Sequence, residues 1–116
     1  MKHPFELRVD RSQGATRIAL VGEVDIAVRE TVRDAVTDAL SERPAPELVI
    51  DLREVTFMDS AGIGELVACH KRAVEKSGTI KILKPNEKLL DLFTITKLIE
   101  IFDIYENEKD ALKAFA

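Results

Sequence analysis

The chain has 116 residues, of which 46% are hydrophobic and 33% are charged, and its formal net charge is -4. This length and composition suit one folded domain and exclude a disordered chain. The acidic excess argues against a nucleic-acid surface, which would need a basic patch. No apolar run approaches the roughly 20 residues that cross a bilayer, and the first residues are not typical of a signal peptide. The single cysteine, Cys69, excludes an internal disulfide and a zinc cluster and favours the cytoplasm.

The first part of the chain has the pattern of a β-hairpin. Hydrophobic residues at 5, 7 and 9 alternate with charged ones, which predicts a strand with one buried face. Residues 12–15 have turn chemistry, and the alternation resumes over 16–21. Residues 22–26 are predicted to form a bend or short strand, in which Asp25 caps the following helix.

Helices and strands then alternate. Residues 28–40 place hydrophobic side chains three and four apart, which predicts an amphipathic helix that ends before Pro44. The run 48–52 is apolar without alternation apart from Asp51, which is typical of a strand covered on both faces. Further on, the pattern predicts a helix from Ile63 to about Lys76, a strand at 79–83, a helix capped by Asn86, a strand at 101–105 and a helix capped by Asn107. We therefore predict a single α/β domain over residues 1–116, with a mixed β-sheet of four to five strands and amphipathic helices packed mainly on one face.

Ser60 stands where we expect the loop after a strand to become a helix. Its hydroxyl is predicted to cap that helix by accepting from free N–H groups of the first turn. The same N–H groups and the helix dipole favour an anion such as a phosphate. Gly62 and Gly64 follow, although each costs about 1 kcal/mol relative to alanine within a helix. We expect them to leave room for the backbone of a partner protein.

These residues carry a resemblance to the anti-sigma factor antagonists of bacteria, which are members of the STAS domain family. The similar segments are 22–25, 48–52 and above all Phe57 to Gly64. The family pattern at the last segment is Asp-Ser, a small residue, Gly, an aliphatic residue, and Gly or Ala, and the chain meets it at every position. The similar order of elements covers nearly the whole chain.

The resemblance implies a partner-switching protein rather than an enzyme. Such an antagonist binds an anti-sigma factor that is also a serine kinase, and so frees a sigma factor for transcription. The kinase phosphorylates the serine that corresponds to Ser60, which releases the antagonist, and a metal-dependent serine phosphatase restores binding. The resemblance places Asp25 and Asp59 beside the acceptor on a docking surface with Ala61 and Gly62. We expect no cofactor, no metal, no nucleic-acid or membrane partner, and a monomer when the protein is free.

Plainer interpretations stay open for the single residues. On spacing alone, Asp25 is a cap or turn residue, and loop geometry explains Asp59 as well as docking does. His70 falls in the apolar stripe formed by Ile63, Leu66, Val67, Ala73 and Val74, and is predicted to be a hydrogen-bonded core residue. Cys69 is predicted to be a packing residue.

Three other functions are alternatives to the switch. A serine hydrolase would need a glycine two residues before the nucleophile, where Met58 stands. The chain has only His3 and His70 as bases, and His70 would lie roughly 15 Å along the same helix. A nucleotide-binding module is weakly indicated, because the glycines form a lone GxG. A STAS scaffold whose Ser60 is never phosphorylated has the same sequence features.

Overall fold

The computed structural model describes residues 5–115, and the strands in this range form one five-stranded sheet. β1 (Phe5–Ser12) and β2 (Ala15–Val24) form an antiparallel hairpin. β3 (Glu47–Met58), β4 (Thr79–Leu83) and β5 (Asp103–Tyr105) continue the sheet in parallel, in the order β1-β2-β3-β4-β5. Gln13 and Gly14 make the hairpin turn with φ values of 52° and 86°, a geometry that follows the twist of the strands. The mixed sheet is as predicted.

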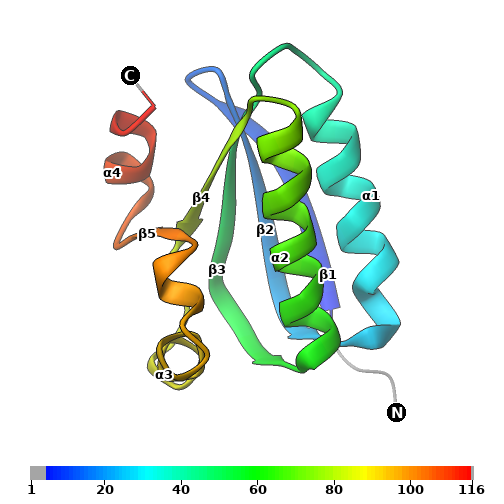
Figure 1. Cartoon of the computed structure of the whole chain (residues 1–116), viewed down its shortest axis with the longest axis vertical. Helices are drawn as coiled ribbons and strands as arrows, with labels where there is room; N and C mark the ends of the chain where they lie inside the picture. Colours follow the sequence, from blue (N-terminus) through cyan, green and yellow to red (C-terminus); the bar gives the residue numbers. More distant parts are fainter. Residues whose placement is uncertain (1–4, 116) are drawn as a thin grey trace.

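Helices connect the parallel strands, because such strands need long crossovers. Within the described range the connections contain the 3-10 turn η1 (Ile26–Val28), α1 (Arg29–Leu40), α2 (Ser60–Glu75), α3 (Glu87–Ile95) and the 3-10 turn η2 (Leu98–Glu100). A further helix, α4 (Glu108–Lys113), follows β5. α1 and α2 lie side by side over one face of the sheet, whereas α4 lies on the other side, near β4 and β5 (Figure 1). The prediction that helices pack mainly on one face is confirmed.

The main core lies between the sheet and α1, α2 and α3. Its completely buried side chains include Ile18, Val36, Leu48 and Phe93. A smaller cluster under α4 contains the buried residues Val49, Leu83 and Ala111. Residues 48–52 of β3 are therefore buried on both faces, as the apolar run predicts.

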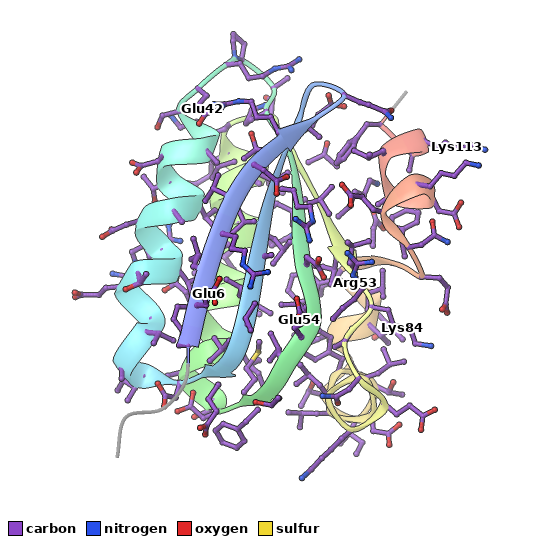
Figure 2. The ribbon with its side chains drawn as sticks, turned by 180° about the vertical axis from the view of Figure 1, so that it is seen from behind. Glu6, Glu42, Arg53, Glu54, Lys84 and Lys113 are labelled. Atoms are coloured by element: carbon purple, nitrogen blue, oxygen red, sulfur yellow. The ribbon has the colours of Figure 1, made fainter. Side chains whose placement is uncertain are left out.

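Charged side chains, including Glu6, Arg53 and Glu54, lie on the face of the sheet away from α1 and α2 (Figure 2). Arg17 and Arg53 approach Asp51 at 2.7 and 2.8 Å. Burial would raise the pKa of Asp51, but the hydrogen bonds from Arg53 and Arg17 outweigh it and hold the pKa below its usual value. This buried carboxylate is thus kept ionised by its partners.

Several boundaries differ from those predicted. β2 continues to Val24, through residues where a bend or short strand was expected. β3 continues to Met58, so that Asp59 alone separates it from α2 and the expected loop is absent. α2 begins at Ser60 instead of Ile63, because its first turn is exposed or glycine-rich and lacks an apolar periodicity. The last strand is confined to Asp103–Tyr105, and η2 takes up the residues before it.

Candidate functional site

Ser60 lies at the end of the molecule where β2 and β3 finish and where η1, α1 and α2 begin (Figure 1). Binding sites of α/β sheets gather at the carboxyl ends of parallel strands. Ser60 is the first residue of α2 and is exposed to solvent. A protein partner can therefore reach this position without any rearrangement of the core.

Asp59 holds this end of the fold together through backbone groups. Its carboxylate accepts from Gly62 N at 2.9 Å and from Ile26 N at 3.3 Å, and its own N–H donates to the carbonyl of Val24 at 3.2 Å. The prediction that the Ser60 hydroxyl caps the helix is wrong, because Asp59 is the N-cap. A carboxylate in this position also gains from the helix dipole.

Asp25 lies in the neighbouring turn, where β2 becomes η1. Its carboxylate accepts from Ala27 N at 3.0 Å, so its predicted role as a helix cap is confirmed for the 3-10 turn that leads into α1. Asp59 binds the N–H of Ile26, the residue that follows Asp25. The structure thus brings Asp25, Asp59 and Ser60 to one surface from two connections that are far apart in the sequence.

The two glycines of α2 serve different purposes. Gly62 is buried, and a Cβ atom there would lie 2.5 Å from the carbonyl oxygen of Val24 and 2.7 Å from Cγ of Met58. It is needed for close packing of α2 against the end of β2, so space for a partner is not its explanation. Gly64 is exposed with nothing within 4 Å of such a Cβ, and Ala61 is half-buried. The prediction that both glycines leave space for a partner therefore holds for Gly64 and is wrong for Gly62.

Glu65 is a feature that the hydrophobic pattern does not identify. Its side chain is 1% exposed and accepts from Arg29 at 3.4 Å, Arg33 at 3.1 Å and Arg72 at 2.8 Å. Burial would raise the pKa of Glu65, but hydrogen bonds from Arg72 and Arg33 outweigh it and lower the pKa. The cluster joins α1 to α2 one turn beyond Ser60. The available signal was its spacing, because Glu65 lies three residues after Gly62 on the buried side of α2.

The remaining candidates on α2 are structural. Cys69 is buried, and burial together with the nearby Glu65 raises the pKa of its thiol to about 12, which confirms a packing role. His70 is half-buried and meets the ring of Phe102 edge-on at 5.8 Å, and it makes no side-chain hydrogen bond to another described residue. The predicted hydrogen-bonded core histidine is therefore wrong. Val74 is 62% exposed and does not belong to the buried stripe. His3 lies outside the described residues.

None of the helices within residues 5–115 is both long enough and apolar enough to span a membrane. No group of three or more His, Cys, Asp or Glu side chains within the same range is arranged to hold a metal ion.

Comparison with known proteins places this geometry in a family. The model of the STAS domain matches residues 6–111. The chain belongs to the STAS domain family.

Its relatives in this family include named regulators of sigma factors. The chain is similar to the anti-sigma F factor antagonist of Paenibacillus polymyxa, with 28% identity over 93% of this chain and 92% of the relative. It is 32% identical to the anti-sigma-B factor antagonist of Bacillus subtilis, over 83% of this chain and 86% of the relative.

Solved structures share the STAS fold. An anti-sigma factor antagonist from Mycobacterium paratuberculosis superposes with a TM-score of 0.84 at 24% identity, covering 96% of this chain and 93% of that one. The Bacillus cell fate determinant SpoIIAA in its phosphorylated form gives 0.72 at 20% identity, covering 97% and 100%. At these identities the likeness establishes the fold.

Proposed function

We propose that this STAS protein is an anti-sigma factor antagonist that is switched off by phosphorylation of Ser60. In its unphosphorylated form it binds an anti-sigma factor with serine kinase activity, and so frees a sigma factor in the cytoplasm. The kinase transfers phosphate to Ser60 and releases the protein, and a serine phosphatase restores binding. The protein acts as a substrate and binding partner, not as an enzyme.

The observation that carries this proposal is the exposed Ser60 at the start of α2, directly after the capping carboxylate of Asp59. The names of the two relatives support the antagonist function, and the phosphorylated form of SpoIIAA supports the mode of regulation. The docking surface is formed by Asp25, Asp59, Ser60 and Ala61. Gly62, which is buried, contributes by letting α2 pack closely enough to present them.

Electrostatics explains why phosphate would release the partner. Phosphorylation adds about -1.5 to -2 charges at one point. Asp59 already places a carboxylate one residue away, and both of its oxygens are engaged by backbone N–H groups. An interface fitted around a neutral hydroxyl would have to bury this added charge without a partner, which costs several kcal/mol.

The first test is phosphorylation by the cognate kinase. We expect ATP and the kinase to add one phosphate, located on Ser60 by mass spectrometry, and Ser60→Ala to abolish it. Ser41 and Ser77 are also exposed and serve as internal controls. A phosphate on Ser12, Ser41 or Ser77 instead of Ser60 would contradict the proposal.

The second test separates the switch from its alternatives, which are a STAS scaffold and a ligand- or nucleotide-binding module that is not controlled by phosphorylation. The unmodified protein and its Ser60→Asp and Ser60→Asn variants are immobilised for pull-downs from the native cell, and the retained proteins are identified. Ser60→Asn is the matched neutral control for Ser60→Asp. We expect the unmodified protein and Ser60→Asn to retain an anti-sigma factor kinase and Ser60→Asp to lose it. Equal retention by all three would favour the scaffold.

A further inference from the structure

A mostly apolar groove of about 340 Å³ lies between the end of β3, two residues before Ser60, and α3. β3 contributes Phe57 and Met58 to its lining, and α3 contributes Leu89, Leu92 and Ile95. Two of these side chains are unusually exposed for their size, with Phe57 at 49% and Ile95 at 78%. The groove therefore offers hydrophobic surface at the same end of the molecule as Ser60.

A β-bulge in β3 directs Phe57 outward. Gly22 of β2 pairs with Val55, but the next residue, Glu23, pairs with Phe57, so β3 carries one extra residue at this point. Val55 and Met58 are both buried although they are three residues apart, and Phe57 between them faces solvent. Without the bulge, regular alternation would turn Phe57 to the side of Val55. Bulges are common next to functional sites, where they change the direction of a side chain.

The opposite wall of the groove is fixed to β3 by Asn86. β3 pairs with β4 only as far as Asp51 and Leu83, so the later carbonyl of Val55 has no ladder partner on this side. Asn86 donates to that carbonyl at 2.9 Å, and its side-chain oxygen caps α3 by accepting from Leu89 N at 2.9 Å. One residue thus positions α3 against β3. The groove is formed before any partner arrives, which reduces the entropy that binding must offset.

The position of Ser60 determines what can cover the groove. Phe57 lies three residues before Ser60, so their Cα atoms are at most about 11 Å apart. A stable protein interface covers about 800 Å² on each partner, equivalent to a disc of roughly 16 Å radius. A protein centred on Ser60 would therefore cover Phe57 as well. Exposed aromatic side chains in such a position are frequent binding hot spots.

We propose that the groove receives an apolar side chain of the same protein that binds at Ser60. The docking surface then extends from Ser60 across Phe57 to Ile95, and the occupant is a leucine, methionine or phenylalanine next to the partner segment that reaches the serine. Lys88 and Asp91 line the groove as well and provide polar contacts around that side chain. This inference rests on the proposed function, because Ser60 supplies the partner.

The test uses the purified kinase that the unmodified protein retains. Its affinity is measured by calorimetry for the unmodified protein and for Phe57→Ala and Ile95→Ala, with folding checked by circular dichroism. Phe57 is 49% exposed and Ile95 is 78% exposed, so truncation of either side chain should leave the fold intact. We expect each to weaken binding about tenfold or more. The matched control is Val74→Ala, which truncates an exposed side chain roughly 20 Å further along α2 and should leave the affinity unchanged.

Phosphorylation kinetics give a second measurement. Because the groove is separate from the reacting hydroxyl, Phe57→Ala should raise the KM of the kinase for this protein and leave kcat unchanged. A fall in kcat at constant KM would overturn a docking role. The fluorescent probe 1-anilinonaphthalene-8-sulfonate tests whether a small apolar ligand occupies the groove instead. We expect the kinase to displace the probe from the groove. Probe that stays bound in the complex would overturn the inference.

The outcomes separate this inference from the proposed function. If Ser60→Asp abolishes binding while Phe57→Ala and Ile95→Ala bind like the unmodified protein, the groove is not part of the interface and the switch stands. If the unmodified protein binds no kinase, the proposed function and this inference are both overturned.

Discussion

The first and second turns of α2 are held in different ways. In the first turn Ser60 is exposed, and the capping carboxylate of Asp59 contacts backbone N–H groups. In the second turn Glu65 is buried and accepts hydrogen bonds from arginines of both α1 and α2. The helix is thus anchored one turn beyond the position where the phosphate would be added. A new charge on Ser60 can therefore alter the surface while the packing of α2 stays as it is.

The largest effect on stability should come from the second turn. Glu65→Ala removes a buried carboxylate from three arginines, and we expect it to lower the free energy of unfolding by about 3 kcal/mol. Urea unfolding measures this loss. Glu75→Ala, an exposed position on the same helix, is the control and should stay within about 0.5 kcal/mol of the unmodified protein. A Glu65→Ala protein as stable as the control would show that the cluster is no anchor.

Acid should weaken the second turn specifically. The pKa of Glu65 is lower in the folded protein than its usual value of 4.5, so the unfolded chain binds the proton more readily. The stabilisation is fully present above pH 4.5 and is lost as the pH falls through the folded pKa. We expect the stability difference between the unmodified protein and Glu65→Gln to shrink as the pH falls below 4.5. Asp51 titrates in both proteins and cancels in the comparison. A difference that does not depend on pH would contradict the assigned charge.

The two glycines test how tightly the start of α2 packs. Gly62→Ala forces a Cβ atom against Val24 and Met58, and we expect a loss of about 2 kcal/mol in the free energy of unfolding. Gly64→Ala places the same atom in open space and should stabilise α2 by up to about 1 kcal/mol. Denaturant unfolding of the pair gives both values. Equal effects at the two positions would show that the close approach at Gly62 is wrong.

The capping interaction of Asp59 should contribute less than the anchor. Asp59→Ala removes the hydrogen bonds to Gly62 N and Ile26 N, and we expect a loss of about 1.5 kcal/mol. Hydrogen exchange would show faster exchange of these two amides, whereas amides near Cys69 keep their protection. Loss of protection along the whole of α2 would mean that the first turn supports the second.

The sequence predicts most of the fold because its elements carry local signals. Asn86 and Asn107 cap helices as expected, since a side-chain cap depends on neighbouring residues only. The start of α2 is harder to predict, because Asp59 and Ser60 are both good caps and only the backbone geometry at the end of β3 decides between them. Adjacent candidates of this kind are not resolved by spacing.

The sequence does not predict which individual side chains are buried. Glu65 is charged, which is typical of a surface residue, and its burial depends on arginines of α1 that lie more than thirty positions earlier in the chain. Phe57 shows the opposite case. An aromatic residue at the end of a strand is typical of a core position, but the bulge formed where β3 pairs with β2 exposes its side chain. Both features depend on tertiary contacts. The spacing of Glu65 indicates its side of α2 but not the arginines that surround it.

The smallest effect on stability, and the largest on binding, should come from Ser60 itself. The unmodified protein, the protein phosphorylated on Ser60 and Ser60→Asn are compared for the free energy of unfolding and for affinity toward the retained kinase. We expect the free energies of unfolding to agree within about 0.5 kcal/mol. We expect the affinity to fall about 100-fold or more for the phosphorylated protein alone, because an unpaired charge is then buried in the interface. Phosphorylated protein that binds the kinase as tightly as the unmodified protein, or that loses affinity only because it unfolds, would contradict a switch that acts at the surface.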